Sequence, residues 1–320
     1  MTGAIQFRID KRDGGSRVDD FCASRFGNLS RMRIGNLIEA GACLVNGSPG
    51  RAGHRLAEGD LVEVAFEEGA PTAMFPEPIP LEIVYEDEQI LVVIKPAGML
   101  VHPTIGVKTG TLANALAYHL NRLRMEDSNR LAYPGSSIVN PQALVRPGLV
   151  HRLDRATSGL MVVARTPRAL TTLSRHFRRR LVEKQYLAFV WGRVQQDSGT
   201  IDAPIGRDPD ARPHWRVMEG GKLAETRFKV VERQRSTTLL ELQPVTGRTN
   251  QLRIHCAHIG HPIVGDELYG ELPVAEGGSR LCLHAARLAF HHPATGVWME
   301  FESELPGDMV AAVAGKVSRE

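Results

Sequence analysis

One short stretch of the sequence combines residue types that could act on a substrate. Within residues 150–160 a single carboxylate, Asp154, lies between two guanidinium groups, Arg152 and Arg155. Nearby positive charge favours the ionised form of a carboxylate, and an ionised carboxylate can act as a nucleophile. The same pattern also fits an ordinary ion-pair cluster at a surface turn, and taken alone it favours that interpretation.

The residues that follow predict the element that would hold this carboxylate in place. Thr157, Ser158 and Gly159 predict a turn, in which the glycine can adopt a positive φ. The apolar run that continues to Ala164 is rich in β-branched residues and is typical of a buried strand. We therefore expect Asp154 to lie at the edge of a buried strand.

The stretch His151-Arg152-Leu153-Asp154-Arg155-x-Thr157-Ser158-Gly159 resembles the signature of the RluA-type pseudouridine synthases. Members of this family isomerise chosen uridines in structured RNA, and the Asp of the motif is their catalytic residue. Residues 95–103, 244–266 and 281–293 resemble further family blocks. The resemblance covers roughly residues 80–305.

The resemblance implies a role for several residues. Asp154 would be the catalytic carboxylate, and Arg253 would pair with it. Tyr186 would stack on the target base and assist proton removal from C5, although a strand tyrosine more often belongs to the core. The residues expected to bind substrate are Arg152, which would fill the space left by a flipped base, and Arg155, Arg248 and Gln251.

This chain departs from the family pattern at one position of the second long block. Asn250 stands where relatives usually have His. Asn can form hydrogen bonds but cannot change its charge near pH 7. The departure therefore puts a proton-transfer role at that position in doubt, while a positioning role remains compatible with Asn.

A basic helix is predicted after the buried strand. Thr166 is a suitable N-cap and Pro167 a suitable first residue, and four apolar residues recur at helical spacing: Leu170, Leu173, Phe177 and Leu181. Residues 165–184 hold seven basic residues and one acid. A solvated face usually mixes its charges, so this bias favours contact with a polyanion; a merely soluble face is the alternative. The helix residues expected to contact RNA are Arg175, Arg178 and Arg179.

Residues 1–66 predict a small α/β domain. Ser30 fits the N-cap and Gly41 the position just past the end of one helix. Arg31 and Arg33 fall in its first turn, where positive charge opposes the helix dipole. This placement suggests a negatively charged partner, and two solvated surface arginines are the alternative. The region resembles the S4 RNA-binding module, which docks on RNA backbone and carries no chemistry.

The remainder of the chain divides at a proline-rich stretch. Residues 67–80 contain four prolines, which exclude a helix or a central strand and predict a linker. Residues 81–320 would then form the catalytic domain. The resemblance implies an α+β fold, in which helices flank a mixed, mainly antiparallel sheet. Within it, residues 121–148 predict a long polar loop, either functional or disordered.

Composition narrows the class of protein. The net charge is only +3, so an RNA site must come from local clustering rather than a global field. The four cysteines are scattered, which favours reduced thiols over disulfides or a zinc site. The N-terminus has no apolar signal-peptide core, and no apolar run approaches the roughly 18 residues of a membrane span. We expect a soluble, cytoplasmic monomer that does not bind a membrane.

No cofactor or metal is expected. The sequence contains no G-x-G-x-x-G, and residues 106–110 lack the full spacing of a phosphate loop. His255, His258 and His261 recur every three residues and could suggest a metal site. Gly260 and Pro262 break the helical face that such a site would need.

The sequence therefore predicts an isomerase that converts uridine to pseudouridine in structured RNA, with large-subunit ribosomal RNA as the first expectation and transfer RNA as the second. One alternative is an RNA-binding protein that has lost its activity, which the presence of Asp154, Tyr186 and Arg253 argues against. Another alternative is a glycoside or N-glycosyl hydrolase, but such enzymes usually pair two carboxylates, and the motifs supply one.

Overall fold

The computed structural model describes residues 5–26, 31–65, 74–104, 106–126, 145–209, 214–270 and 280–314. Its contacts divide the chain into two compact units, with one boundary between Phe75 and Pro76. This boundary falls within the proline-rich stretch of residues 67–80. Two further boundaries, after Arg122 and after Leu144, assign residues 123–144 to the first unit and the chain from Val145 onward to the second.

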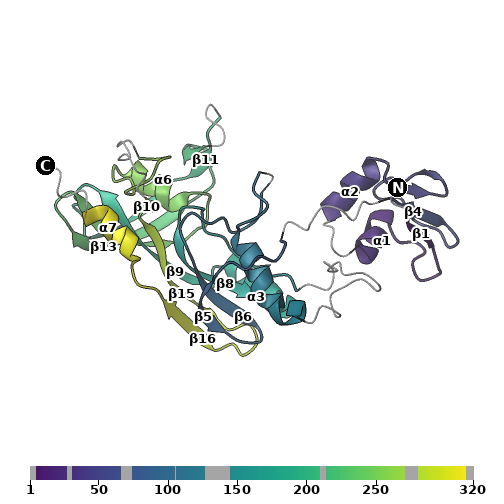
Figure 1. Ribbon diagram of the computed structural model, residues 1–320. Coiled ribbons are helices and arrows are strands. Elements are labelled where there is room, and N and C mark those ends of the chain that lie inside the picture. The colour runs from purple at the N-terminus through teal and green to yellow at the C-terminus, as the bar shows by residue number, and fades with distance from the viewer. Residues whose placement is uncertain are drawn as a thin grey trace. The chain divides into compact units, whose positions relative to one another are not determined.

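The first unit is a four-stranded antiparallel sheet with two helices (Figure 1). Its elements are β1 (Ile5–Arg8), α1 (Val18–Arg25), α2 (Arg31–Glu39), β2 (Cys43–Val45), β3 (Ser48–Pro49) and β4 (Leu61–Val64). Asn46 and Gly47 both adopt positive φ and form the turn between β2 and β3. Helix α2 begins at Arg31, so Arg31 and Arg33 occupy its first turn, while Ser30 lies outside the described residues.

The second unit is built on a ten-stranded sheet whose central order is β10-β13-β14-β9-β15-β8-β6-β5. Strands β8 and β15 run parallel, whereas the other pairs of the described sheet are antiparallel. The predicted α+β class with a mixed, mainly antiparallel sheet is confirmed. The strands are β5 (Glu82–Glu86), β6 (Ile90–Lys95), β7 (Gly148–Leu149), β8 (Ser158–Ala164), β9 (Glu183–Trp191), β10 (Ser198–Asp202), β13 (Glu225–Arg233), β14 (Thr237–Pro244), β15 (Leu283–His291) and β16 (Trp298–Glu302), and β11 (Ile205–Arg207) and β12 (Trp215–Val217) form a separate hairpin.

Helices cover both faces of the sheet around β6 and β8. Side chains alternate along a strand, so Leu91 and Met161 pack with α3 (Leu112–Glu126) on one face. Val92 and Val162 pack with α5 (Pro167–Arg178) on the other. Because both faces are covered, every residue of β8 is buried, as its apolar run predicted.

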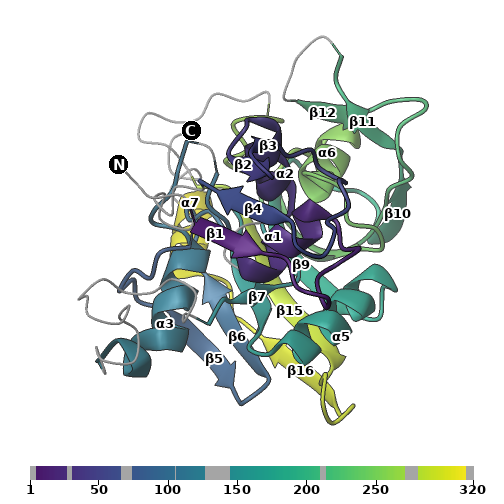
Figure 2. The same cartoon turned by 90° about the vertical axis from the view of Figure 1, so that its right-hand side faces the viewer.

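The other half of the sheet carries α6 (Gln251–His258) and α7 (Gly307–Ala314) (Figure 2). One cluster of buried side chains joins both helices to β9 and β14. Its members include Leu252 and Cys256 from α6, Met309 and Val313 from α7, and Val190 and Leu240 from the strands. This packing fixes α6 beside the end of β14, and the loop between them reaches the candidate site.

Two helices differ from their predicted extent. Helix α3 continues to Glu126, into the stretch predicted to be a loop, and residues 127–144 of that loop lie outside the described residues. Helix α5 ends at Arg178, so Leu181 lies beyond it and is 48% exposed. Leu170 is also 37% exposed, whereas Leu173 of the predicted stripe is buried together with Ala169. Across the described residues, no helix has the length and apolar character needed to cross a membrane.

Candidate active site

Asp154 lies in the segment that joins β7 to β8. The segment is anchored by neighbours on both sides, since Leu153 and Thr157 are buried. The backbone N–H of Thr157 donates to the backbone carbonyl of Asp154 at 3.2 Å. The Asp154 side chain itself is half-buried and faces a pocket, as the edge-of-strand placement predicted.

Gly159 is required where this segment enters the sheet. Its φ is 121°, a value that L side chains rarely adopt. It also pairs with Ala285 in the parallel contact between β8 and β15. A Cβ on Gly159 would lie 2.5 Å from the backbone nitrogen of Ala285. Any larger residue would therefore push β15 away from the strand that follows Asp154.

Lys95 holds the same segment through hydrogen bonds from the end of β6. It ends β6 and is fully buried, and its Nζ donates to the backbone carbonyls of Pro96 at 2.7 Å, Met99 at 2.8 Å and Arg155 at 3.2 Å. Burial lowers the pKa of the Lys95 ammonium to about 8, although the negative charge of Asp154 opposes this shift. The sequence placed this lysine in a block that resembles the family, and the structure shows that it ties the residue after Asp154 to β6.

His151 supports the segment as a neutral residue. Its Nε2 accepts a hydrogen bond from the backbone N–H of Val162 at 3.0 Å, and its ring stacks on Phe177 with centroids 4.5 Å apart. Burial lowers the pKa of His151 to about 3, with a further contribution from the charge of Lys184. The imidazole therefore carries no charge at neutral pH and takes part in packing rather than proton transfer.

Ser158 is held by a polar network that reaches α7. Its Oγ lies 2.8 Å from Nδ1 of His284, and Arg280 donates to the same oxygen at 2.5 Å. Arg280 also forms an ion pair of 2.6 Å with Asp308 on α7. The His284 ring reaches Ser303 on its other side at 3.0 Å. The residues after Asp154 are thus fixed from β6 and from α7, and the predicted turn over residues 157–159 is wrong for Ser158 and Gly159, which already belong to β8.

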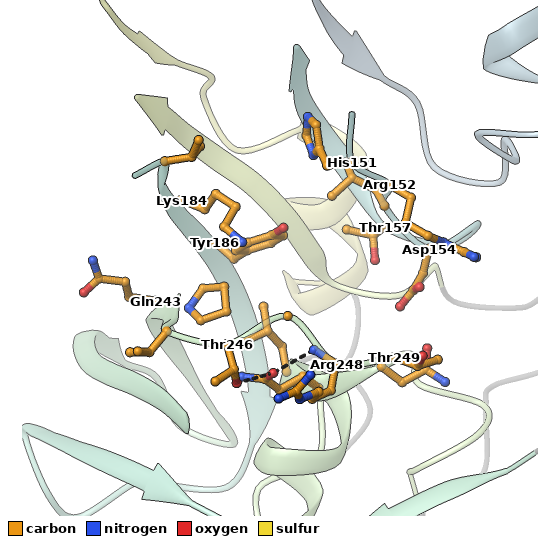
Figure 3. Close-up of a pocket in the computed structure, with 18 of the residues that line it drawn as sticks. His151, Arg152, Asp154, Thr157, Lys184, Tyr186, Gln243, Thr246, Arg248 and Thr249 are labelled. Atoms are coloured by element: carbon orange, nitrogen blue, oxygen red, sulfur yellow. Dashed lines mark hydrogen bonds between the residues drawn. The ribbon is translucent and has the colours of Figure 1, made fainter. Parts of the chain in front are cut away.

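The pocket beside Asp154 has a volume of about 720 Å³. It is bounded by the Asp154 segment, the end of α5, β9, β13 and the loop from β14 to α6. Figure 3 shows Tyr186 extending from β9 with its hydroxyl directed toward Asp154 across the pocket. Arg253 lines the same pocket from α6. The three residues predicted to be catalytic are therefore brought together around one cavity.

The pKa of Asp154 differs from the expectation for a carboxylate among arginines. Burial raises its pKa above the ordinary value, and the charges of Arg253, Arg152 and Lys95 lower it by less. The sequence pattern correctly shows that Arg152 favours the ionised form, but it does not show the loss of solvent, which shifts the pKa further in the opposite direction.

Tyr186 keeps its proton firmly. Burial raises the pKa of its phenol, and the nearby Asp154 carboxylate raises it further. A phenol with a raised pKa donates hydrogen bonds and stacks, but it is a poor base in the resting enzyme. This observation favours the expected stacking role over the expected help in removing a proton.

Arg253 forms its ion pair with Asp266 rather than with Asp154. Its guanidinium makes two hydrogen bonds to the Asp266 carboxylate, at 2.6 and 2.7 Å, and Asp266 is buried. It also lies 5.1 Å from the ring centroid of Tyr269. Arg253 still acts on Asp154 through its charge, which lowers the pKa of that carboxyl. The expected pairing is thus electrostatic, and Asp266 is a site residue that the sequence did not single out.

Asn250 contributes to this network as a positioning residue. Its backbone lies in the left-handed region, with φ of 54°, which Asn tolerates better than most residues. Its amide donates to the Tyr269 hydroxyl at 3.1 Å, and its carbonyl oxygen accepts from Arg253 at 3.4 Å. Asn250 therefore holds Arg253 and Tyr269 without changing charge.

Gln251, which was predicted to bind substrate, forms its hydrogen bonds within the chain. Gln251 is buried, and its Oε1 accepts from the Thr246 hydroxyl at 2.7 Å and the Arg248 backbone at 2.9 Å. Its amide donates to the Glu225 carbonyl at 2.9 Å and to Thr226 at 3.0 Å. Its side chain fixes the loop and has no free group for a ligand.

The arginines predicted to bind substrate fall in different places. Arg152 and Arg248 line the pocket, and Arg248 also donates to the Leu223 carbonyl at 3.0 Å. Arg155 does not line the pocket among the described residues. Its guanidinium donates to the Gly98 carbonyl at 3.0 Å, and its own carbonyl accepts from Lys95. Arg155 therefore braces the Asp154 segment.

The pocket is strongly cationic. Its lining includes the carboxylates Asp154 and Glu183, and the basic residues Arg152, Arg178, Arg180, Lys184, Arg227, Arg248 and Arg253. Of the three α5 arginines predicted to bind RNA, Arg178 lines the pocket, whereas Arg175 and Arg179 are exposed outside it. Lys184 could have been found from sequence, since residues two apart on a strand share a face and Tyr186 follows it by two.

Two of the three histidines that suggested a metal site, His255 and His261, bond to other parts of the fold. His255 is buried, with Nδ1 2.9 Å from the Thr226 hydroxyl and Nε2 3.0 Å from the Ala203 carbonyl. His261 Nδ1 lies 2.8 Å from the Trp191 carbonyl. In the part of the chain that the structure describes, no cluster of His, Cys, Asp and Glu is arranged to hold a metal.

Known proteins resemble this chain along most of its length. The family described as RNA pseudouridylate synthase matches residues 89–258. An uncharacterized RNA pseudouridine synthase of Bacillus subtilis is 40% identical over 309 residues, covering 97% of each chain. Ribosomal large subunit pseudouridine synthase D of Pseudomonas aeruginosa is 41% identical over 309 residues, covering 93% of this chain and 91% of the relative.

A solved structure has the same fold. Human RNA pseudouridylate synthase domain containing 1 is 30% identical with a TM-score of 0.55, covering 75% of this chain and 86% of the human chain. The chain therefore belongs to the RNA pseudouridine synthase family. The predicted enzyme class, an isomerase that forms pseudouridine in RNA, is confirmed at this level.

Proposed function

We propose that this enzyme converts uridine to pseudouridine in large-subunit ribosomal RNA, with Asp154 as the catalytic carboxylate. The observation that carries the proposal is the position of Asp154, half-buried in a cationic pocket opposite Tyr186. A polyanionic substrate suits such a pocket. Its other acidic residue, Glu183, is paired with Arg287 at 2.9 Å, so the described lining holds no second unpaired carboxylate of the kind that glycoside hydrolysis uses.

The reaction needs little beyond positioning and charge. The bond from uracil N1 to ribose C1′ breaks, the base rotates, and C1′ joins C5, whose proton is then lost. No oxidation and no net hydrolysis occur, so water must be kept from C1′ while the base is detached. A uridine in structured RNA must first be flipped out of its stack to enter the pocket.

Each residue has a role in this proposal. Asp154 acts at the ribose, where its carboxylate meets the positive charge that develops on C1′. Tyr186 stacks on the uracil, and its protonated hydroxyl lies between the base and Asp154. Arg253, fixed by Asp266, supplies the positive charge that keeps the carboxylate available. Arg152, exposed at the pocket, fills the space vacated by the flipped base.

The choice of ribosomal RNA rests on relatives. Three relatives named ribosomal large subunit pseudouridine synthase D, from Pseudomonas aeruginosa, Xanthomonas campestris and Pasteurella multocida, are 38–41% identical to this chain. Transfer RNA is the second candidate. We place the enzyme in the cytoplasm, where both substrates are made.

The test is a map of pseudouridine in ribosomal and transfer RNA from a strain that lacks the gene. Sites in large-subunit ribosomal RNA should disappear, return with the wild-type gene, and stay absent with Asp154→Asn. Loss confined to transfer RNA would replace the proposed substrate. Release of free uracil from RNA in vitro would replace the proposed reaction with hydrolysis.

The N-terminal unit is proposed to be an S4-like RNA-binding domain, with residues 67–80 as its linker to the catalytic domain. Two helices on a small sheet and the two basic residues that open α2 support this proposal. In the full-length enzyme, Arg31→Glu with Arg33→Glu should weaken binding to the substrate RNA while leaving turnover at saturating RNA. Unchanged affinity would contradict the assignment.

A further inference from the structure

The pocket has a second cationic region, which lies away from Asp154 at the corner between α5 and β9. Arg178 ends α5, Arg180 follows in the connection, and Lys184 lies at the start of β9. All three line the pocket. We call these three residues the α5–β9 corner. Figure 3 shows Lys184 beside Tyr186, on the side of that ring away from Asp154.

Lys184 is a half-buried cation that has uncharged side chains near it in the pocket. The residues around it in the pocket include the neutral His151, Phe177 and Val182. Burial lowers the pKa of the Lys184 ammonium. The adjacent carboxylate, Glu183, is already paired with Arg287, and Lys184 has no acidic partner within the described residues. Removing an ammonium from water without a partner is costly.

Arg180 occupies a backbone position that favours glycine. Its φ is 57°, and it stands just past the end of α5. The N–H of Arg180 donates to the Phe177 carbonyl at 3.2 Å, and that of Leu181 to the His176 carbonyl at 3.0 Å. This pair of bonds is the Schellman motif, whose left-handed residue is usually Gly. The corner therefore keeps an arginine in the pocket at a cost in backbone energy.

We infer that the α5–β9 corner is a binding site for an RNA phosphodiester next to the flipped nucleotide, with Lys184 as its innermost contact. This inference rests on the proposed function and adds the place where the RNA backbone is held. Tyr186 lies between Asp154 and the α5–β9 corner. If the target base stacks on the Asp154 side of Tyr186, the RNA backbone attached to that nucleotide can pass beside the corner. A phosphodiester would supply the charge that Lys184 lacks in the chain.

The first experiment compares Lys184→Met with the matched control Lys229→Met. Lys229 lies exposed on β13 and does not line the pocket. The RNA is an unmodified transcript of the large-subunit fragment that contains the mapped uridine. Lys184→Met should raise KM at least tenfold with a much smaller fall in kcat, and should reduce the slope of log Kd against log salt by about 0.7–0.9. Lys184→Arg should restore both, and Lys229→Met should match wild type.

The second experiment locates the phosphate. A synthetic stem–loop carries a neutral methylphosphonate at each position flanking the target uridine in turn. One substitution should weaken binding by the wild-type enzyme as much as Lys184→Met does, and should weaken binding by Lys184→Met no further.

Several outcomes would overturn the inference. The first is an unchanged KM and salt slope for Lys184→Met, and the second is a fall in kcat with KM unchanged. The third is that every methylphosphonate weakens binding by Lys184→Met as much as it weakens binding by the wild-type enzyme. Failure of the proposed function is a separate result, since it would appear as absence of pseudouridine in the wild-type reaction. The salt slope tests the corner even then, because it measures binding alone.

Discussion

The two walls of the pocket satisfy their polar groups differently. On the α6 wall, Arg253 pairs with Asp266, Asn250 bonds Tyr269, and the Gln251 amide has four partners within the chain. On the α5–β9 corner, Lys184, Arg178 and Arg180 have no carboxylate partner among the described residues. The α6 wall is complete before RNA arrives, whereas the corner lacks negative charge that RNA can supply.

This difference separates two tasks. Under the proposed function, the groups that act on the reacting atoms are held in advance by buried bonds, so little reorganisation remains at the moment of reaction. Groups that recognise the backbone keep unused donors. Changes on the first wall should therefore alter stability and turnover, and changes on the corner should alter affinity and its dependence on salt.

The largest effect is expected at Asp154. Asp154→Asn keeps the shape of the side chain and removes its charge, so the rate of pseudouridine formation should fall by about a thousandfold or more. RNA affinity should persist or increase, because the pocket becomes more positive. Single-turnover rates and equilibrium binding measure the two quantities. A variant that still turns over would remove Asp154 from the chemistry.

The next effect should come from the buried pair on the α6 wall. Asp266→Asn leaves the Arg253 charge without its carboxylate, so unfolding in urea should show a loss of about 3–5 kcal/mol, with a fall in kcat. Glu300→Gln is the matched control, since its pair with Arg287 is more exposed, and should cost less than about 1 kcal/mol. Equal losses in the two variants would mean that the Arg253 pair is no more than a surface contact.

The dependence of activity on pH gives a third test. If the Asp154 carboxylate is the active form, kcat/KM falls as pH drops through its pKa, and burial places that pKa above the ordinary value of about 3.9. The negative charge of Asp266 contributes to the rise. In Asp266→Asn, the acid limb should therefore move to lower pH. A limb that stays in place, with circular dichroism showing intact fold at each pH, would assign the titration to another group.

The smallest effect concerns the backbone at the corner. Arg180→Gly should relieve the left-handed conformation and stabilise the fold by up to about 1 kcal/mol, while RNA binding weakens severalfold. Arg180→Ala removes the same charge but keeps a Cβ, so it should weaken RNA binding without the gain in stability. Thermal unfolding and salt-dependent binding distinguish the two. Unchanged binding in both variants would leave the arginine without a role.

The sequence predicted what depends on local pattern. The buried run of β8 and the Thr166 cap of α5, whose hydroxyl accepts from the Ala169 N–H at 3.1 Å, follow from spacing and side-chain type. The family motifs placed Asp154 and Tyr186 at one site. The features that the sequence did not predict depend on tertiary contacts.

Three misses show why. Arg155 follows Asp154 in the chain but turns to Gly98, since adjacent residues need not face the same way. Asp266, the ion-pair partner of Arg253, comes from a loop after α6. A sequence motif does not indicate which of several carboxylates will pair with an arginine. Burial of Asp154, which reverses the expected shift of its pKa, arises from the pocket walls and has no signature in the neighbouring letters.

The bond from Arg280 to Ser158 spans 122 positions of the chain, and Asp308, which holds Arg280, comes later still. Translation delivers the N-terminal parts first, so β8 is made long before the residues that hold its first residue, Ser158. Contacts between such distant segments also form late, because closing a long loop carries an entropic cost. Under the proposed function, we therefore expect a nascent chain to expose the arginine-rich helix before the Asp154 segment is fully held, because Arg280 and Asp308 must first be synthesised and α7 docked.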